Sequence, residues 1–166
     1  MRPGVQQLFE TLDPFFIFGV FTAGQKAYAD FVISKIDPKD EYIKFRFYRD
    51  SCKPMNRWQV KDLNKVVKYF KDHKPGVFKD IADPLSRIVI IDNISESYQL
   101  QPNNGIKIRD WYGTDFVDKH LVNLTAFLLS VAESNVPDLR TEICKYYKMP
   151  SNKIVGGGTS IYKPSL

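Results

Sequence analysis

The chain has 166 residues, of which 43% are hydrophobic and 26% charged, as expected for one globular domain with a sizeable core, and this excludes a disordered or fibrous protein. Its two cysteines lack C-x-x-C spacing, which excludes a zinc ribbon or thioredoxin motif, and no apolar run reaches the roughly 20 residues of a membrane helix. The formal charge of +5 arises from residues 53–80, where seven Lys and one Arg face three Asp, so we expect no direct nucleic-acid binding.

Helical and strand patterns alternate in the first third of the chain. Apolar residues at helical spacing predict a short opening helix that Asp13-Pro14 would end. The continuously apolar run that follows predicts a strand covered on both faces, as in a parallel sheet. The elements expected here are a helix over 5–12, a strand over 15–21, a helix over 25–36, a half-buried strand over 42–48 and a loop over 49–54.

A lysine-rich amphipathic helix is predicted next. Apolar residues recur at helical spacing between Val60 and Phe70, and most lysines of this stretch fall on the opposite side. The aromatic residues of this stretch, Tyr69 and Phe70, are adjacent and do not interleave with the lysines in the manner of an RNA-stacking platform. The lysines therefore form either a solvated helix face or a local rim that attracts anions. A surface insertion is expected over about 70–86, where His73-Lys74-Pro75-Gly76 and Asp83-Pro84 interrupt regular structure.

The second half continues the alternation. Ile88 to Asp92 reads as a second buried strand and residues 106–108 as a short third strand, and helices are predicted over 115–134 and 137–147. Residues 1–150 are therefore expected to form one domain. Residues 151–166, with Gly156-Gly157-Gly158, are expected to be a flexible tail, because the glycines are followed neither by a helix nor by the residues of a phosphate-binding loop.

Strands that alternate with helices predict an α/β domain with a mainly parallel sheet. In such sheets, ligands bind beyond the carboxyl ends of the strands. Thr22 follows the first buried strand, and Asp92 and Asn93 end the second. One crevice could then hold a hydroxyl donor together with oxygen ligands for a metal, although each residue alone would also suit an ordinary turn.

Four segments in this order carry a family resemblance: Phe21-Thr22-Ala23-Gly24 with residues 27–30, then residues 47–52, 60–63 and 90–98. They resemble the catalytic domain of the small phosphatases that act on the C-terminal domain of RNA polymerase II, NLI-interacting-factor-like members of the haloacid dehalogenase superfamily. The match covers roughly residues 2–134. The resemblance implies a Rossmann-like, mainly parallel sheet and an Mg²⁺-dependent phosphatase of phosphoserine or phosphothreonine proteins.

The resemblance also implies roles for individual residues. Thr22 would bind the transferred phosphoryl group, Lys61 would neutralise its charge, and Asp92 and Asn93 would help to hold Mg²⁺. These residue types suit phosphoryl transfer, which depends mainly on positioning and charge stabilisation.

Partner and location are implied in the same way. Tyr28 and Arg49 resemble the family's contacts to the phosphopeptide, so the expected partner is a phosphoprotein or an acidic peptide. An intracellular location is expected, in the nucleus rather than in the mitochondrion.

The sequence departs from the family pattern at the nucleophile. The family carries it in a D-x-D-x-T segment on a strand before Arg-Pro-Gly, whereas here Arg2-Pro3-Gly4 follows Met1 directly and no D-x-D occurs in the 166 residues. We therefore expect an amino-terminally incomplete or inactive phosphatase domain that lacks its nucleophile strand. About a dozen residues are also inserted between Lys61 and Asp92, and Ile94 stands where the family usually has a small polar residue.

Two other functions compete with this interpretation of the sequence, a cysteine phosphatase and a binding module. Cys52 is flanked by basic residues, but Cys52 and Arg57 are separated by four residues rather than the five of a phosphate-cradling Cys-Arg loop, which argues against a cysteine phosphatase. The alternative to the phosphatase is a non-catalytic binding module, which would resemble the presequence receptor of the mitochondrial inner-membrane translocase.

Overall fold

The computed structural model describes residues 1–148, so the predicted tail over 151–166 lies outside the described residues. The helices are α1 (Val5–Leu12), α2 (Lys26–Ile36), α3 (Asn64–His73), α4 (His120–Glu133) and α5 (Leu139–Lys148). The strands are β1 (Phe18–Phe21), β2 (Ile43–Phe47), β3 (Lys53–Met55), β4 (Trp58–Val60), β5 (Ile90–Asp92) and β6 (Gly105–Lys107). The order of elements agrees with the α/β prediction.

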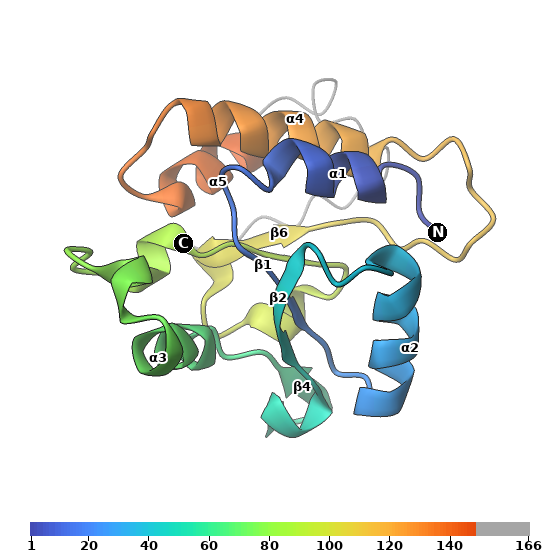
Figure 1. Cartoon of the computed structure of the whole chain (residues 1–166), viewed down its shortest axis with the longest axis horizontal. Helices are drawn as coiled ribbons and strands as arrows, with labels where there is room; N and C mark the ends of the chain where they lie inside the picture. Colours follow the sequence, from blue (N-terminus) through green and yellow to red (C-terminus); the bar gives the residue numbers. More distant parts are fainter. Residues whose placement is uncertain (149–166) are drawn as a thin grey trace.

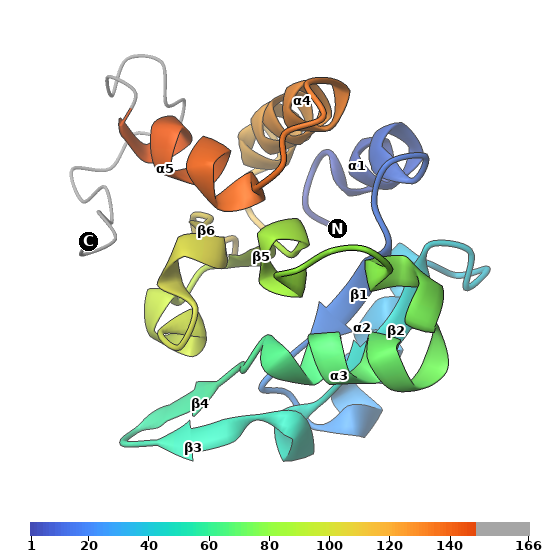
Figure 2. The same cartoon turned by 90° about the vertical axis from the view of Figure 1, so that its left-hand side faces the viewer.

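The strands form three separate pairs. β1 pairs with β2 and β5 with β6, both in parallel, whereas β3 and β4 form an antiparallel hairpin. Figure 2 shows the two parallel pairs as distinct ribbons. The predicted parallel pairing is therefore confirmed, but among residues 1–148 the strands do not join into one continuous sheet.

The first strand is shorter and less covered than its sequence predicts. Of the apolar run 15–21, only Phe18 to Phe21 pairs with β2, and the side chains of Phe15 and Ile17 are 51% and 48% exposed. Phe15 and Ile17 lie before the part of the run that pairs with β2, and β1 itself has a strand neighbour on one edge only within the described chain. Gly19 lies under a ring of β2, because a Cβ there would come within 2.1 Å of the Phe45 ring.

The helices bury two apolar clusters. Figure 1 shows α1 and α4 side by side, with α5 next to α4, on one side of the strands. The first cluster joins these helices to β2 and β6 through residues such as Leu12, Leu128 and Ile106. The second cluster lies under α3, where Leu63, Val66 and Phe70 pack with Ile90 and Tyr98. Each cluster contains residues of both parallel strand pairs.

The sequence analysis missed the β3–β4 hairpin. The pattern predicts a loop at Lys53 and Pro54, whereas Lys53 pairs with Val60 and Pro54 with Gln59, and Asn56 makes the turn with φ 53°. Proline rarely occupies a strand interior, so the pattern gave no strand signal. Val60 consequently ends β4 instead of starting the lysine-rich helix, which begins at Asn64.

The loop before α4 is longer than predicted and is tied to the amino terminus. The helix begins at His120 instead of Asp115, and just before it the Asp118 carboxylate accepts the His120 backbone N–H at 3.0 Å. Arg2 clamps the loop: its guanidinium donates to both Asp118 oxygens at 3.2 and 2.8 Å and to the Arg109 carbonyl at 2.7 Å.

Candidate functional site

Thr22 lies directly beyond the carboxyl end of β1. Its backbone N–H donates to the Phe47 carbonyl at 2.9 Å, which continues the pairing with β2 by one residue. Its hydroxyl oxygen accepts the Gly24 N–H at 3.0 Å and closes a tight turn. Because a hydroxyl carries its own proton as well, Thr22 can still donate to an anion at this point.

Lys61 and Asp92 form a buried ion pair. Lys61 follows β4, and its backbone N–H donates to the Ser97 carbonyl at 2.6 Å. Its ammonium pairs with Asp92, the last residue of β5, and the two side chains are only 11% and 6% exposed. The other Asp92 oxygen accepts the Ile94 N–H at 2.8 Å. The structure thus joins two of the predicted site residues that are 31 positions apart.

Cys52 contacts the Thr22 turn, and the charges of Lys61 and Lys65 influence its thiol. Its Sγ lies 3.6 Å from the Thr22 carbonyl oxygen. Burial raises the pKa of the Cys52 thiol, and the positive charges of Lys61, Lys65 and Arg49 oppose that rise without cancelling it. A thiol held in its protonated form is a poor nucleophile, which supports the rejection of a cysteine phosphatase.

Tyr28 and Arg49 both lie next to Gly24. The Arg49 backbone N–H donates to the Gly24 carbonyl at 3.1 Å, and a Cβ at Gly24 would lie 3.6 Å from the Tyr28 ring. Both side chains are exposed, and Tyr28 is 69% accessible. The structure therefore gathers these two residues at the Thr22 turn, where a peptide could reach them.

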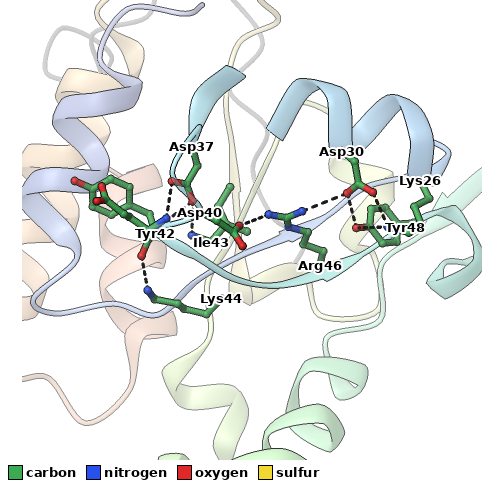
Figure 3. Close-up of polar contacts among 10 residues, drawn as sticks. Lys26, Asp30, Asp37, Asp40, Tyr42, Ile43, Lys44, Arg46 and Tyr48 are labelled. Atoms are coloured by element: carbon green, nitrogen blue, oxygen red, sulfur yellow. Dashed lines mark hydrogen bonds and ion pairs between the residues drawn. The ribbon is translucent and has the colours of Figure 1, made fainter. Parts of the chain in front are cut away.

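A polar network between α2 and β2 holds this corner in place (Figure 3). The Tyr48 hydroxyl donates to Asp30 at 2.6 Å, and Asp30 also pairs with Lys26 and, at 3.5 Å, with Arg46. The hydrogen bonds from Lys26 and Tyr48 hold the pKa of Asp30 below its usual value. Since Arg49 follows Tyr48 in the chain, the network positions the backbone that carries Arg49.

Asn93 contacts Asp110, a residue that the sequence patterns did not single out. It is exposed, and its amide nitrogen donates to Asp110 Oδ1 at 2.6 Å. Asp110 lies shortly after β6, the parallel neighbour of β5, so both residues reach the same edge. The predicted strand over 106–108 could have pointed to Asp110, because carboxyl ends of parallel strands meet at one edge.

The described residues do not complete a magnesium site. Within residues 1–148, no three Asp, Glu, His or Cys side chains gather at one place. Both oxygens of Asp92 already accept hydrogen bonds, from Lys61 and from the Ile94 N–H. Mg²⁺ takes octahedral oxygen ligands, several of them usually waters, so Asp92 and Asn93 would supply only part of such a set.

A largely apolar cleft separates the two parallel strand pairs. Its volume is about 540 Å³, and it is lined by Phe18, Gly19 and Phe21 of β1 and by Ile90 and Ile91 of β5, among others. Each of these strands has a hydrogen-bonded strand partner on one edge only among the described residues. The cleft therefore runs between two open strand edges whose carboxyl ends carry Thr22 and Asp92.

Comparison with known proteins identifies the family. The family described as NLI interacting factor-like phosphatase matches residues 1–140. The chain is 32% identical over 145 residues to mitochondrial import inner membrane translocase subunit TIM50 of Homo sapiens, covering 87% of this chain and 36% of that protein. It is 34% identical over 148 residues to CTD small phosphatase-like protein 2 of Dictyostelium discoideum, covering 89% of this chain and 23% of that protein.

These curated relatives are much longer than the stretch that matches, since the chain spans about a third of the human translocase subunit. A structure of the fission yeast RNA polymerase II CTD phosphatase Fcp1 superposes with a TM-score of 0.49 and 18% identity, over 89% of this chain and 38% of that one. No helix within residues 1–148 has the length and apolar character that a bilayer crossing requires. With its family match over residues 1–140, the chain belongs to the NLI interacting factor-like phosphatases.

Proposed function

We propose that this chain is the phosphate- and peptide-binding part of a phosphoprotein phosphatase domain that acts on phosphoserine or phosphothreonine. The observation that carries the proposal is the cleft between β1 and β5, because Thr22, Lys61 and Asp92 lie around the carboxyl ends of the elements beside it. In this proposal Tyr28 and Arg49, which both lie next to Gly24, contact the peptide.

The cleft is the proposed place of a further parallel strand. Open strand edges present unpaired backbone groups, and a strand between them would form hydrogen bonds with both. The resulting order, β2–β1–added strand–β5–β6, is the single parallel sheet of the haloacid dehalogenase type. The apolar lining suits a strand that is apolar on both faces, as in a buried parallel sheet.

The added strand would also supply the missing nucleophile. Its first carboxylate would attack phosphorus and form an aspartyl phosphate, and the ester P–O bond would break. A second carboxylic acid would give its proton to the leaving serine or threonine oxygen, and water would then hydrolyse the aspartyl phosphate. Thr22 would donate a hydrogen bond to the phosphoryl oxygens, and Lys61 would stabilise their charge.

Magnesium binding is proposed only for the completed sheet. The carboxylate of the added strand would complete the oxygen ligands that Asp92 and Asn93 begin. Lys61, released from Asp92 by a bound phosphate, would then face the anion.

The test supplies the strand in two ways. An apolar segment that ends in D-x-D-x-T is fused ahead of Met1, or a peptide with the same sequence is added to the 166-residue chain. Release of phosphate from a phosphoserine peptide is measured with Mg²⁺. The expected result is turnover with the fused strand, and saturable stimulation by the peptide.

The matched control replaces the first Asp of the strand by Asn, which should fill the cleft without supporting turnover. A stabilised fold with the Asn strand and activity only with the Asp strand would fit the proposal. Absence of turnover in the fused protein, although its thermal transition rises, would refute phosphatase function and leave the cleft assignment standing.

A second candidate is a binding module without phosphatase chemistry. The 32% identity to a translocase subunit supports it. In that case the fused strand stabilises the chain, turnover stays at background, and non-phosphorylated basic amphipathic peptides bind. A nuclear or a mitochondrial location would accompany the first or the second candidate, respectively.

A further inference from the structure

Four exposed lysines form a row along α3 and just beyond its end. Lys65, Lys68 and Lys71 are spaced three residues apart on the face opposite the buried Val66 and Phe70, and Lys74 follows the helix. Residues three apart are neighbours on a helix surface. We call Lys65, Lys68, Lys71 and Lys74 the lysine rim. The structure thus confirms a surface helix with an outward lysine face.

The positive charge of the lysine rim is largely uncompensated. Lys68 pairs with Asp72 at 2.7 Å, but within residues 1–148 no ion pair links the other three rim lysines to a carboxylate. Asp62, the nearest other acid in sequence, accepts hydrogen bonds from Asn64 and Gln101. Charges elsewhere in the chain balance, so this surface is the main cationic region of the protein.

The lysine rim begins beside the proposed phosphate site. Lys65 lies in the first turn of α3, four residues after Lys61 in the chain. The Cys52 Sγ, which the charges of both lysines influence, lies 3.6 Å from the carbonyl oxygen of Thr22. A peptide with its phosphate at Thr22 and Lys61 therefore has cationic surface within reach on the α3 side.

The spacing of the rim fits an extended chain. Six helical residues from Lys65 to Lys71 rise about 9 Å, and an extended peptide covers that length in about three residues. Acidic side chains two to four positions from the phosphorylated residue would therefore meet successive lysines. A cationic peptide would be repelled by the same surface.

We propose that the lysine rim binds acidic or phosphorylated residues that flank the target phosphoresidue, so that the substrate class is acidic or multiply phosphorylated peptides. This inference rests on the proposed function for the location of the first phosphate. The occupant is an acidic peptide and not RNA or a membrane. The aromatic residues between the rim lysines offer little surface for base stacking, because Phe70 is buried and Tyr69 half-buried, and none of the exposed large hydrophobic side chains lies on α3, as a membrane-binding helix would need.

The test compares three labelled peptides that bind to the full chain, measured by fluorescence anisotropy. The first carries one phosphoserine among alanines, the second adds glutamates two and four residues away on both sides, and the third has these glutamates but no phosphate. We expect the second peptide to bind roughly 5- to 30-fold tighter than the first at about 0.1 M salt, as expected for three exposed ion pairs. The advantage should fall to about twofold or less at about 1 M salt, where the screening length shrinks from about 10 to about 3 Å.

Variants locate the effect. Lys65→Glu/Lys71→Glu should abolish the preference for the second peptide, whereas Lys39→Glu/Lys119→Glu, with the same change in net charge at exposed positions elsewhere, should retain it. Because Glu at position 71, in the last turn of α3, can destabilise the helix, Lys65→Gln/Lys71→Gln serves as a second variant with an intermediate loss. Thermal transitions of all variants check that each is folded.

The outcomes separate the two proposals. Equal affinity for the first and second peptides, with both dependent on phosphate, refutes the lysine rim and leaves the phosphate site intact. Equal affinity for the second and third peptides, both lost in Lys65→Glu/Lys71→Glu, supports the rim and refutes the phosphate site. Tighter binding to phosphatidylserine vesicles or to RNA than to the second peptide would overturn the assignment of an acidic peptide.

Discussion

The clamp between Arg2 and Asp118 allows a quantitative prediction. Removing the guanidinium, for instance as Arg2→Met, keeps an apolar stem but eliminates three hydrogen bonds, two to Asp118 and one to the Arg109 carbonyl. The Asp118 side chain is only 2% exposed, so its charge would remain buried without a cation. Breaking a buried ion pair in this way destabilises a protein by about 3–5 kcal/mol.

The lower end of this range applies here. Arg2 itself is 12% exposed, and Asp118 keeps the hydrogen bond from the His120 N–H. We therefore expect a loss of about 3 kcal/mol. For a chain of this size that loss lowers Tm by roughly 6–12 °C. Such a loss is a large fraction of the whole stability of a typical domain, about 5–15 kcal/mol.

The assay is thermal unfolding followed by circular dichroism. Lys68→Ala is the matched control, since the pair between Lys68 and Asp72 is 77% and 48% exposed and its loss should leave Tm nearly unchanged. Adding Asp118→Asn to Arg2→Met should recover part of the stability, because a neutral side chain no longer needs a cation. A Tm decrease below about 2 °C in Arg2→Met would refute the reasoning.

The same pair makes stability depend on pH. Burial acts to raise the pKa of Asp118, but hydrogen bonds from Arg2 and from the His120 N–H outweigh it and hold the pKa below its usual value. A carboxyl with a lowered folded-state pKa stabilises the fold above its unfolded pKa of about 3.9, and this contribution is lost as the pH falls through the folded value. The stability gap between wild type and Arg2→Met, measured by urea unfolding, should therefore narrow below about pH 4.

Three further predictions concern packing and chemistry. Gly105→Ala places a Cβ 2.0 Å from the fully buried Tyr98 ring and should destabilise the fold by about 1–3 kcal/mol in urea unfolding; unchanged stability would mean that the ring moves aside. With the strand supplied, Lys61→Ala and Asp92→Ala should each lower turnover by orders of magnitude and Thr22→Val by less, since a neutral hydrogen bond contributes less than a charge; equal losses would contradict this order. Residues 1–166 alone should unfold at a lower temperature than the chain with the strand supplied and show no Mg²⁺-dependent aryl phosphate hydrolysis, because the open edges stay unpaired and the D-x-D-x-T carboxylates are absent; an equal Tm or measurable turnover would contradict this.

Local signals in the sequence predicted most helices and the parallel pairs. Asp13-Pro14 ends α1 as expected, and apolar spacing places α3 with Val66 and Phe70 buried. The extent of β1 could not be predicted, because an apolar run shows that residues avoid water but not which neighbouring strand covers them. Phe15 and Ile17 belong to the apolar run, but they precede the paired residues of β1 and are half exposed.

The types of residue in the candidate site could be predicted from the sequence, but the contacts between them could not. A hydroxyl at one strand end and an acid at another follow from the parallel pattern, as Thr22 and Asp92 do. The ion pair between Lys61 and Asp92 depends on how β4 lies against β5, and the partner of Asn93 depends on a loop after β6. Neither arrangement leaves a periodic signal in the sequence.

The turn between α2 and β2 bears on the order in which the chain folds. The Asp37 carboxylate accepts the backbone N–H groups of Glu41, Tyr42 and Ile43 at 2.9, 3.0 and 2.9 Å (Figure 3). These partners are four to six residues away, so little loop-closure entropy is lost when they meet, whereas the Arg2 clamp must close across 116 positions. Contacts of short sequence separation form early. The β1–α2–β2 unit can therefore assemble first and provide a template on which the amino terminus and α4 dock late.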